Sequence, residues 1–223
     1  MKTVIEKLKV IGVIIGFAAI DQGLLVVMMA TSMYQSSLAF ALRILFALAI
    51  FAGFVTYAQK KGLLDFKTIK PKLLILWELL GYALILLCNY VGMALVEGSG
   101  ATTTSNQAAL EQLFTLLSPA FMGLFVVLIA PLIEELIFRY LIPKVLFKNY
   151  EVIGFIVGVL GFALVHGADS LGDWIIYGGM GAVMAFLYYK TERFEYSLTL
   201  HILNNAIAFA RMMALLKART DVL

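Results

Sequence analysis

Residues 119–142 read PAFMGLFVVLIAPLIEELIFRYLI, a stretch long enough to cross the hydrocarbon core of a bilayer as one helix. Its only charged residues are Glu134, Glu135 and Arg139. The whole 223-residue chain is 62% hydrophobic and 14% charged. A soluble domain is about 45–50% apolar and about 25% charged. The composition therefore excludes a soluble globule and a disordered chain, and it indicates an integral membrane protein.

Hydrophobic runs predict an all-α, polytopic membrane bundle with about seven transmembrane helices. Helices are expected because an open chain in lipid must satisfy its own backbone hydrogen bonds. No repeat or composition shift divides the chain, so residues 1–223 are expected to form a single membrane domain. The predicted spans cover residues 10–30, 38–59, 73–96, 119–142, 152–168, 171–189 and 196–216.

Basic residues predict the orientation of the bundle. They occur in segments 2–9, 60–72, 144–148 and 190–193, whereas the alternate connections 31–37, 97–112 and 167–173 contain no Lys or Arg. The positive-inside rule therefore predicts a cytoplasmic N-terminus. Seven spans then leave Arg211, Lys217 and Arg219 near the outer face. Either the last helix does not cross the membrane as a simple span, or basic residues near the C-terminal end are tolerated because earlier ones fix the topology. The same scattered distribution gives no reason to expect a nucleic-acid partner.

Each charged group at bilayer depth costs at least about 2.5–3.5 kcal/mol on insertion scales, so each is expected to have a structural or functional role. Glu135 and Arg139 are four residues apart, so they are predicted to lie on one helix face and to pair. Glu134 is rotated about 100° from Glu135 and has no partner on its own helix. Pro131 removes a backbone hydrogen bond one turn before this acidic pair.

The two histidines of the chain each have a partner at helical spacing. Phe162 is expected to stack with His166, and His201 lies on one face with Asn205. A buried carboxylate beside imidazoles can activate water as a general base, and an asparagine amide can stabilise an oxyanion. Each group alone also has a structural explanation as an ion pair, a packed histidine or an interhelical hydrogen bond. Together they indicate amide hydrolysis within the membrane.

Three further charged residues fall inside predicted spans. Asp21 and Arg43 are expected to pair between neighbouring helices and to take no part in catalysis. Glu78, about one turn from the cytoplasmic edge, is expected to have a structural role.

The motifs Glu-Glu-x-x-x-Arg, Phe-x-x-x-His and His-x-x-x-Asn occur in this order on successive predicted helices. This arrangement resembles the CPBP family, which comprises CAAX proteases and bacteriocin-processing enzymes and is also called Abi. The resemblance covers residues 130–211, whereas the first half is similar only in consisting of hydrophobic helices. It implies an intramembrane endopeptidase that acts on a membrane-associated protein or peptide, in a bacterial cell membrane.

The resemblance also implies roles for individual residues. Glu134 would be the general base, and His166 would share in water activation. His201 and Asn205 would orient the substrate and stabilise the oxyanion, while Glu135 and Arg139 would support the site. The sequence requires no cofactor and lacks His-Glu-x-x-His, yet Glu134, His166 and His201 could supply ligands to zinc if they converge.

Two other functions compete with the peptidase. A membrane immunity protein could bind a toxic peptide or its receptor without cleaving anything. A proton-coupled carrier also uses Glu, His and Arg inside spans, but it predicts internal repeats, and none is apparent.

Overall fold

The computed structural model describes residues 2–220 and the side chains of residues 4–218. The ends of the predicted domain, residue 1 and residues 221–223, lie outside the described part, as does the side chain of Arg219.

Every regular element among residues 2–220 is a helix, which confirms the predicted all-α class. Six stretches are long and apolar enough to cross a membrane, and α7 is a shorter apolar helix. The prediction of about seven spans is thus met by six spans and this shorter helix. The elements are α1 (Lys2–Thr31), α2 (Ser37–Lys60), η1 (Phe66–Thr68), α3 (Pro71–Gly98), α4 (Ser105–Leu116), α5 (Pro119–Leu124), η2 (Phe125–Ile129), α6 (Ala130–Glu135), η3 (Leu136–Leu146), α7 (Glu151–Val165), α8 (Leu171–Asp173), η4 (Trp174–Gly178), α9 (Gly179–Thr191) and α10 (Phe194–Thr220).

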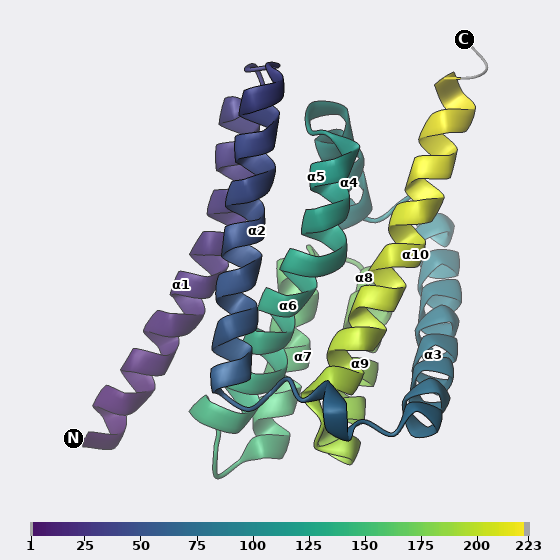
Figure 1. The fold of residues 1–223 in the computed structure, drawn as a ribbon. Helices are drawn as coiled ribbons and strands as arrows, with labels where there is room; N and C mark the ends of the chain where they lie inside the picture. Colours follow the sequence, from purple (N-terminus) through teal and green to yellow (C-terminus); the bar gives the residue numbers. More distant parts are fainter. Residues whose placement is uncertain (1, 221–223) are drawn as a thin grey trace.

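The stretch Pro119–Leu146 forms the centre of the bundle (Figure 1). In its most apolar window 67% of the residues are buried, against 11% in the corresponding windows of α1 and α2. Helices α1 and α2 lie together on one side, where Phe17 meets the ring of Phe54 at 4.8 Å. Helices α3 and α10 lie on the other side and contact each other. The peripheral helices therefore present most of their surface to lipid.

Helix α10 runs the length of the bundle from the end at which α1 begins (Figure 1). It includes the span Phe194–Ala218, so the last helix is long enough to be a simple span. At its first turn Glu195 accepts a hydrogen bond from the backbone of Asp65 at 2.7 Å and pairs with Arg193 at 2.9 Å. These contacts fix the start of α10 against the loop before η1, and with it the position of the residues that follow.

The central stretch is an α-helix interrupted by two π-helical segments, η2 and η3. Ser118 caps its first turn by accepting from the Phe121 N–H, and Pro119 occupies the first turn. The predicted end at residue 142 is wrong, because η3 continues through Pro143 to Leu146. A π-helix joins each N–H to the carbonyl five residues back, so Pro143 leaves only the Phe138 carbonyl without its backbone partner.

Helix α7 packs closely on η3 through glycine. A Cβ atom added at Gly158 would overlap the backbone carbonyl of Phe138, and one at Gly154 would lie 2.5 Å from the Cα of Pro143. Gly154 and Gly158 thus form a Gly-x-x-x-Gly face on which the two helices approach each other closely.

Replacement of Gly158 by Ala is expected to destabilise the protein by about 1–3 kcal/mol, because backbone must move to admit the methyl group. The free energy of unfolding in detergent micelles measures this. The matched control is Gly16→Ala on α1, where an added Cβ meets nothing within 4 Å. That variant should be as stable as wild type or slightly more so. Equal stability of the two variants would contradict the packing argument.

Candidate active site

Glu134, at the centre of the bundle, faces both histidines of the chain. Its Oε2 atom lies 3.5 Å from Nε2 of His201 and 3.8 Å from Nε2 of His166. The Glu134 side chain lies on α6, His166 caps the end of α7, and His201 lies on α10. Three separate helices therefore bring one carboxylate and two imidazoles together.

Glu135 orients His201. Its Oε1 atom lies 3.0 Å from Nδ1 of His201, and its Oε2 atom accepts a short hydrogen bond from the Ser197 hydroxyl. Arg139 lies with Nε 3.5 Å from the same Oε2 atom, so the predicted Glu135–Arg139 ion pair is confirmed. Ser197 was missed by the sequence reasoning, although it precedes His201 by one helical turn and so had a visible signal.

Arg139 is fully buried, and its surroundings explain how a cation is held there. Besides the Glu135 carboxylate, its guanidinium lies 4.8 Å from the centre of the Phe162 ring. Its Nη2 atom contacts the Met184 sulfur at 3.7 Å. The ion pair, the ring face and the polarisable sulfur together offset part of the cost of burial.

His166 is held by its own helix and by aromatic rings. Its Nδ1 atom lies 2.8 Å from the Phe162 carbonyl. The imidazole packs on the Phe162 ring at 4.3 Å, as predicted, and stacks on Tyr177 at 5.1 Å. The Tyr177 hydroxyl is hydrogen-bonded to Thr104 at 2.7 Å. The connection before α4 is thus attached to the site, which residue spacing could not have shown.

The three converging atoms can all act as hydrogen-bond acceptors when the imidazole rings are neutral. A carbonyl and a carboxylate only accept, so Nδ1 is the donor in both histidines. In the neutral form of each ring, Nε2 carries no hydrogen and faces the Glu134 carboxylate as an acceptor. Glu134 Oε2 and His201 Nε2 are buried and make no hydrogen bond within the described protein. Groups of this kind require a proton donor between them, and a water molecule can serve as one.

Asn205 contacts the backbone and is not among the converging side chains. Its Nδ2 atom donates to the Val126 carbonyl at 2.9 Å. In η2 that carbonyl would accept from the N–H of residue 131, but Pro131 has none. Asn205 therefore satisfies the carbonyl that Pro131 leaves free. The structure brings together Glu134, His166 and His201, and places Asn205 one turn further along α10.

The donor types at Glu134, His166 and His201 are those of zinc sites. Among the residues whose side chains the structure describes, however, no group of three or more His, Cys, Asp or Glu is arranged to hold a metal ion. We therefore derive no step through a metal.

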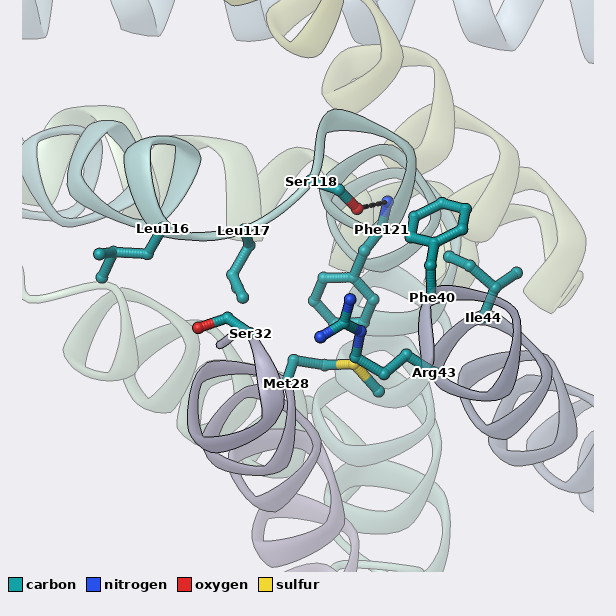
Figure 2. A pocket seen from close by; sticks show the side chains of 9 residues that line it. All are labelled: Met28, Ser32, Phe40, Arg43, Ile44, Leu116, Leu117, Ser118 and Phe121. Atoms are coloured by element: carbon teal, nitrogen blue, oxygen red, sulfur yellow. Dashed lines mark hydrogen bonds between the residues drawn. The ribbon is translucent and has the colours of Figure 1, made fainter. Parts of the chain in front are cut away.

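A cavity of about 130 Å³ lies apart from this cluster, where the end of α1 and the start of α2 meet α5 (Figure 2). Arg43 reaches across it from α2 and donates to the Thr31 carbonyl at the end of α1. Arg43 therefore caps α1, and the predicted pair between Asp21 and Arg43 is wrong. The cavity is lined by Met28, Ser32, Phe40, Arg43, Ile44, Leu116, Leu117, Ser118 and Phe121.

Glu78 on α3 accepts a hydrogen bond from the Thr199 hydroxyl of α10 at 2.6 Å. This bond joins two neighbouring helices and agrees with the structural role predicted for Glu78.

Comparison with known proteins matches residues 116–207 to the type II CAAX prenyl endopeptidase Rce1-like family. The match supports the resemblance of this part of the chain to intramembrane proteases of the CPBP family. Helices α1, α2 and α3 lie before the matched region, which contains all six predicted site residues: Glu134, Glu135, Arg139, His166, His201 and Asn205.

Two curated relatives are bacterial. The membrane-embedded CAAX protease MroQ of Staphylococcus aureus is 30% identical over 64% of this chain and 60% of its own length. The UPF0177 protein YvdC of Lactococcus lactis is 34% identical over 57% of this chain and 49% of its own length. The chain thus spans about half to three fifths of these relatives. No solved structure is significantly similar to it.

Proposed function

We propose that the protein is an intramembrane endopeptidase that hydrolyses a peptide bond of a membrane-associated protein or peptide. The observation that carries the proposal is the meeting of Glu134 Oε2 with Nε2 of His166 and of His201 at 3.8 Å and 3.5 Å. The similarity of residues 116–207 to the Rce1-like CAAX endopeptidase family, and the name of the relative MroQ as a CAAX protease, support the same reaction.

The proposed reaction begins with a water molecule bound between Glu134 and the two imidazoles. Glu134 takes one proton from the water, and the water oxygen attacks the carbonyl carbon of the substrate. The C–N bond then breaks, and Glu134 returns the proton to the leaving nitrogen. The products are a new carboxyl terminus and a new amino terminus, so atoms and protons balance.

The surrounding residues have separate tasks in this proposal. His166 accepts the second hydrogen bond of the water. Glu135, hydrogen-bonded to Nδ1 of His201, holds that ring in the tautomer that presents Nε2. Arg139 balances the charge of Glu135. Asn205 has two amide hydrogens, of which one is bound to Val126, and we assign the other to the developing oxyanion.

We infer that the site lies near the middle of the membrane. Glu134 is fifteen residues from Pro119 and twelve from Leu146, which puts it about 20 Å along the helix from either end. The basic connections support a cytoplasmic N-terminus, with His166 and the connection before α4 toward the opposite face. A substrate would therefore reach Glu134 from within the bilayer or from one of its faces.

The experiment that tests the function compares new peptide termini in membranes of cells that express wild type or Glu134→Gln. Termini found only with wild type, at equal expression, identify proteolysis and its substrates together. Identical termini, with candidate peptides present, would contradict the peptidase proposal and favour a membrane protein that binds a toxic peptide without cleaving it.

Cleavage is expected to be unchanged after incubation with a metal chelator, because the proposed water is activated by side chains alone. The measurement is the rate of purified protein in vesicles before and after chelation. Loss of activity that zinc restores would instead show that Glu134, His166 and His201 rearrange to bind a metal.

A further inference from the structure

An arginine inside a membrane span has no anionic partner after the helix contacts have been assigned. Arg43 is the seventh residue of α2, about 9 Å along the helix from its start. Its Nη1 atom donates to the Thr31 carbonyl, and Arg43 forms no ion pair with any carboxylate in the described part of the chain. A carbonyl engages one of the five N–H groups of a guanidinium and leaves its positive charge unbalanced. An anion from outside the described protein would balance it.

The cavity that Arg43 lines offers donors to such an anion (Figure 2). Its volume is about 130 Å³, and because an apolar cavity of about 150 Å³ can hold benzene, a group as large as a phosphate can enter it. Ser118, which caps α5, lines the same cavity. Its hydroxyl oxygen accepts from the Phe121 N–H at 3.3 Å, while its hydrogen is not bonded within the described protein. Arg43 and Ser118 can therefore both donate to one bound group.

The rest of the lining is apolar or already bonded. The Ser32 hydroxyl donates to the Met29 carbonyl at 2.8 Å, so it has no hydrogen left for a ligand. None of the nine lining residues is acidic. Phe40 and Leu116 are exposed on the lipid-facing side of the bundle, so the cavity adjoins the acyl chains. The apolar lining residues are Met28, Phe40, Ile44, Leu116, Leu117 and Phe121.

The cavity lies at the depth of lipid headgroups. Helix α2 has 24 residues and is therefore about 36 Å long, whereas the hydrocarbon core of a bilayer is about 30 Å thick. The start of α2 thus extends beyond the hydrocarbon. The Arg43 side chain turns toward this end, because it reaches the carbonyl of Thr31, the last residue of α1. Its charge is thereby brought toward the level of the lipid phosphates.

We propose that this cavity binds the phosphate group of an anionic phospholipid, with Arg43 as its ion-pair partner and Ser118 as a hydrogen-bond donor. A guanidinium can hold a phosphate through two parallel N–H···O bonds. The apolar lining receives the glycerol and the first part of an acyl chain, which a free phosphate ion lacks. Because no lining residue is acidic, the cavity favours a headgroup with net negative charge over one that also carries a cation.

The bound lipid would join two parts of the chain. Arg43 belongs to the hairpin of α1 and α2, whereas Ser118 begins the central stretch and lies in the region matched to the CAAX endopeptidase family. A phosphate held by both residues therefore stabilises the contact between hairpin and centre. This binding site goes beyond the proposed peptidase function and does not depend on it.

The test is thermal unfolding of the purified full chain in an uncharged detergent, with phosphatidylglycerol, phosphatidylcholine or inorganic phosphate added. Saturating phosphatidylglycerol is expected to raise the Tm by about 5 °C, because a ligand that binds only the folded state stabilises it. Phosphatidylcholine should have a much smaller effect and inorganic phosphate none. An equal rise with phosphatidylcholine would overturn the preference for an anionic lipid. An equal rise with inorganic phosphate would overturn the lipid as the ligand.

Variants locate the site within the bundle. Arg43→Gln should lose the rise with phosphatidylglycerol, whatever its Tm without lipid. The matched control is Lys60→Gln, which removes an exposed charge at the other end of α2 and should keep the rise.

Ser118 provides a second pair of variants that leave Arg43 in place. Asp and Asn both replace Ser as helix caps, so Ser118→Asp and Ser118→Asn should unfold near the wild-type Tm without lipid. Ser118→Asp places a carboxylate in the cavity and should abolish the rise, whereas Ser118→Asn keeps a donor and should retain most of it. A wild-type rise in Ser118→Asp would overturn the proposal, even if Arg43→Gln failed to fold.

Discussion

The Glu134→Gln variant is expected to cleave substrate about 10²–10⁴-fold more slowly than wild type, because the amide keeps the volume of the side chain but cannot accept a proton from water. Its free energy of unfolding should change little, since Glu134 has no arginine or lysine partner in the described structure. Steady-state kinetics and thermal unfolding of purified protein measure both quantities.

The control for Glu134→Gln is Glu97→Gln. Glu97 is exposed on α3, far along the chain from the site, and this variant should cleave at the wild-type rate. Retention of more than a tenth of the wild-type rate by Glu134→Gln would remove Glu134 from the role of base.

The Arg139→Met variant is expected to lose about 3–5 kcal/mol of stability, because it leaves the fully buried Glu135 carboxylate without its cation. The measurement is chemical unfolding in detergent micelles. The double variant Glu135→Leu with Arg139→Met removes both charges and should recover much of this loss.

Activity should not recover in the double variant. Glu135 accepts from Nδ1 of His201, so leucine at this position leaves the ring without its orienting partner. A double variant as unstable as Arg139→Met would contradict the ion-pair explanation. A double variant with wild-type activity would show that His201 needs no support from Glu135.

Residue spacing predicted the parts of the site that lie within one helix. The four-residue intervals in Glu135–Arg139 and Phe162–His166 place side chains on one face whatever the tertiary structure, and both contacts are present. The catalytic roles of the six predicted site residues remain predictions.

Contacts between helices depend on how each helix is rotated about its axis and how it crosses its neighbours, and residue spacing does not determine either. The Ser197 hydroxyl meets Glu135 from α10, and Thr104 meets Tyr177 from a connecting loop. For the same reason Asp21 was wrongly expected to pair with Arg43. Asp21 lies about two thirds of the way along α1, whereas Arg43 donates a hydrogen bond to Thr31 at the end of that helix.

The π-helical segments were the other feature that the sequence did not reveal. Pro131 was expected to remove a backbone hydrogen bond. It occupies the position from which η2 would have bonded to the Val126 carbonyl, and Asn205 supplies the missing donor. Asn205, which was predicted to stabilise the oxyanion, thus also donates the hydrogen bond that the backbone of a neighbouring helix lacks.

Hydrolysis by water that Glu134 activates is tested most directly by cleavage of a purified membrane peptide. The purified protein is placed in vesicles prepared in ¹⁸O-labelled water. Wild type is expected to produce one new carboxyl terminus containing ¹⁸O, and Glu134→Gln is expected to produce none. Equal labelled product from both proteins, or no product from either, would contradict hydrolysis by water that Glu134 activates.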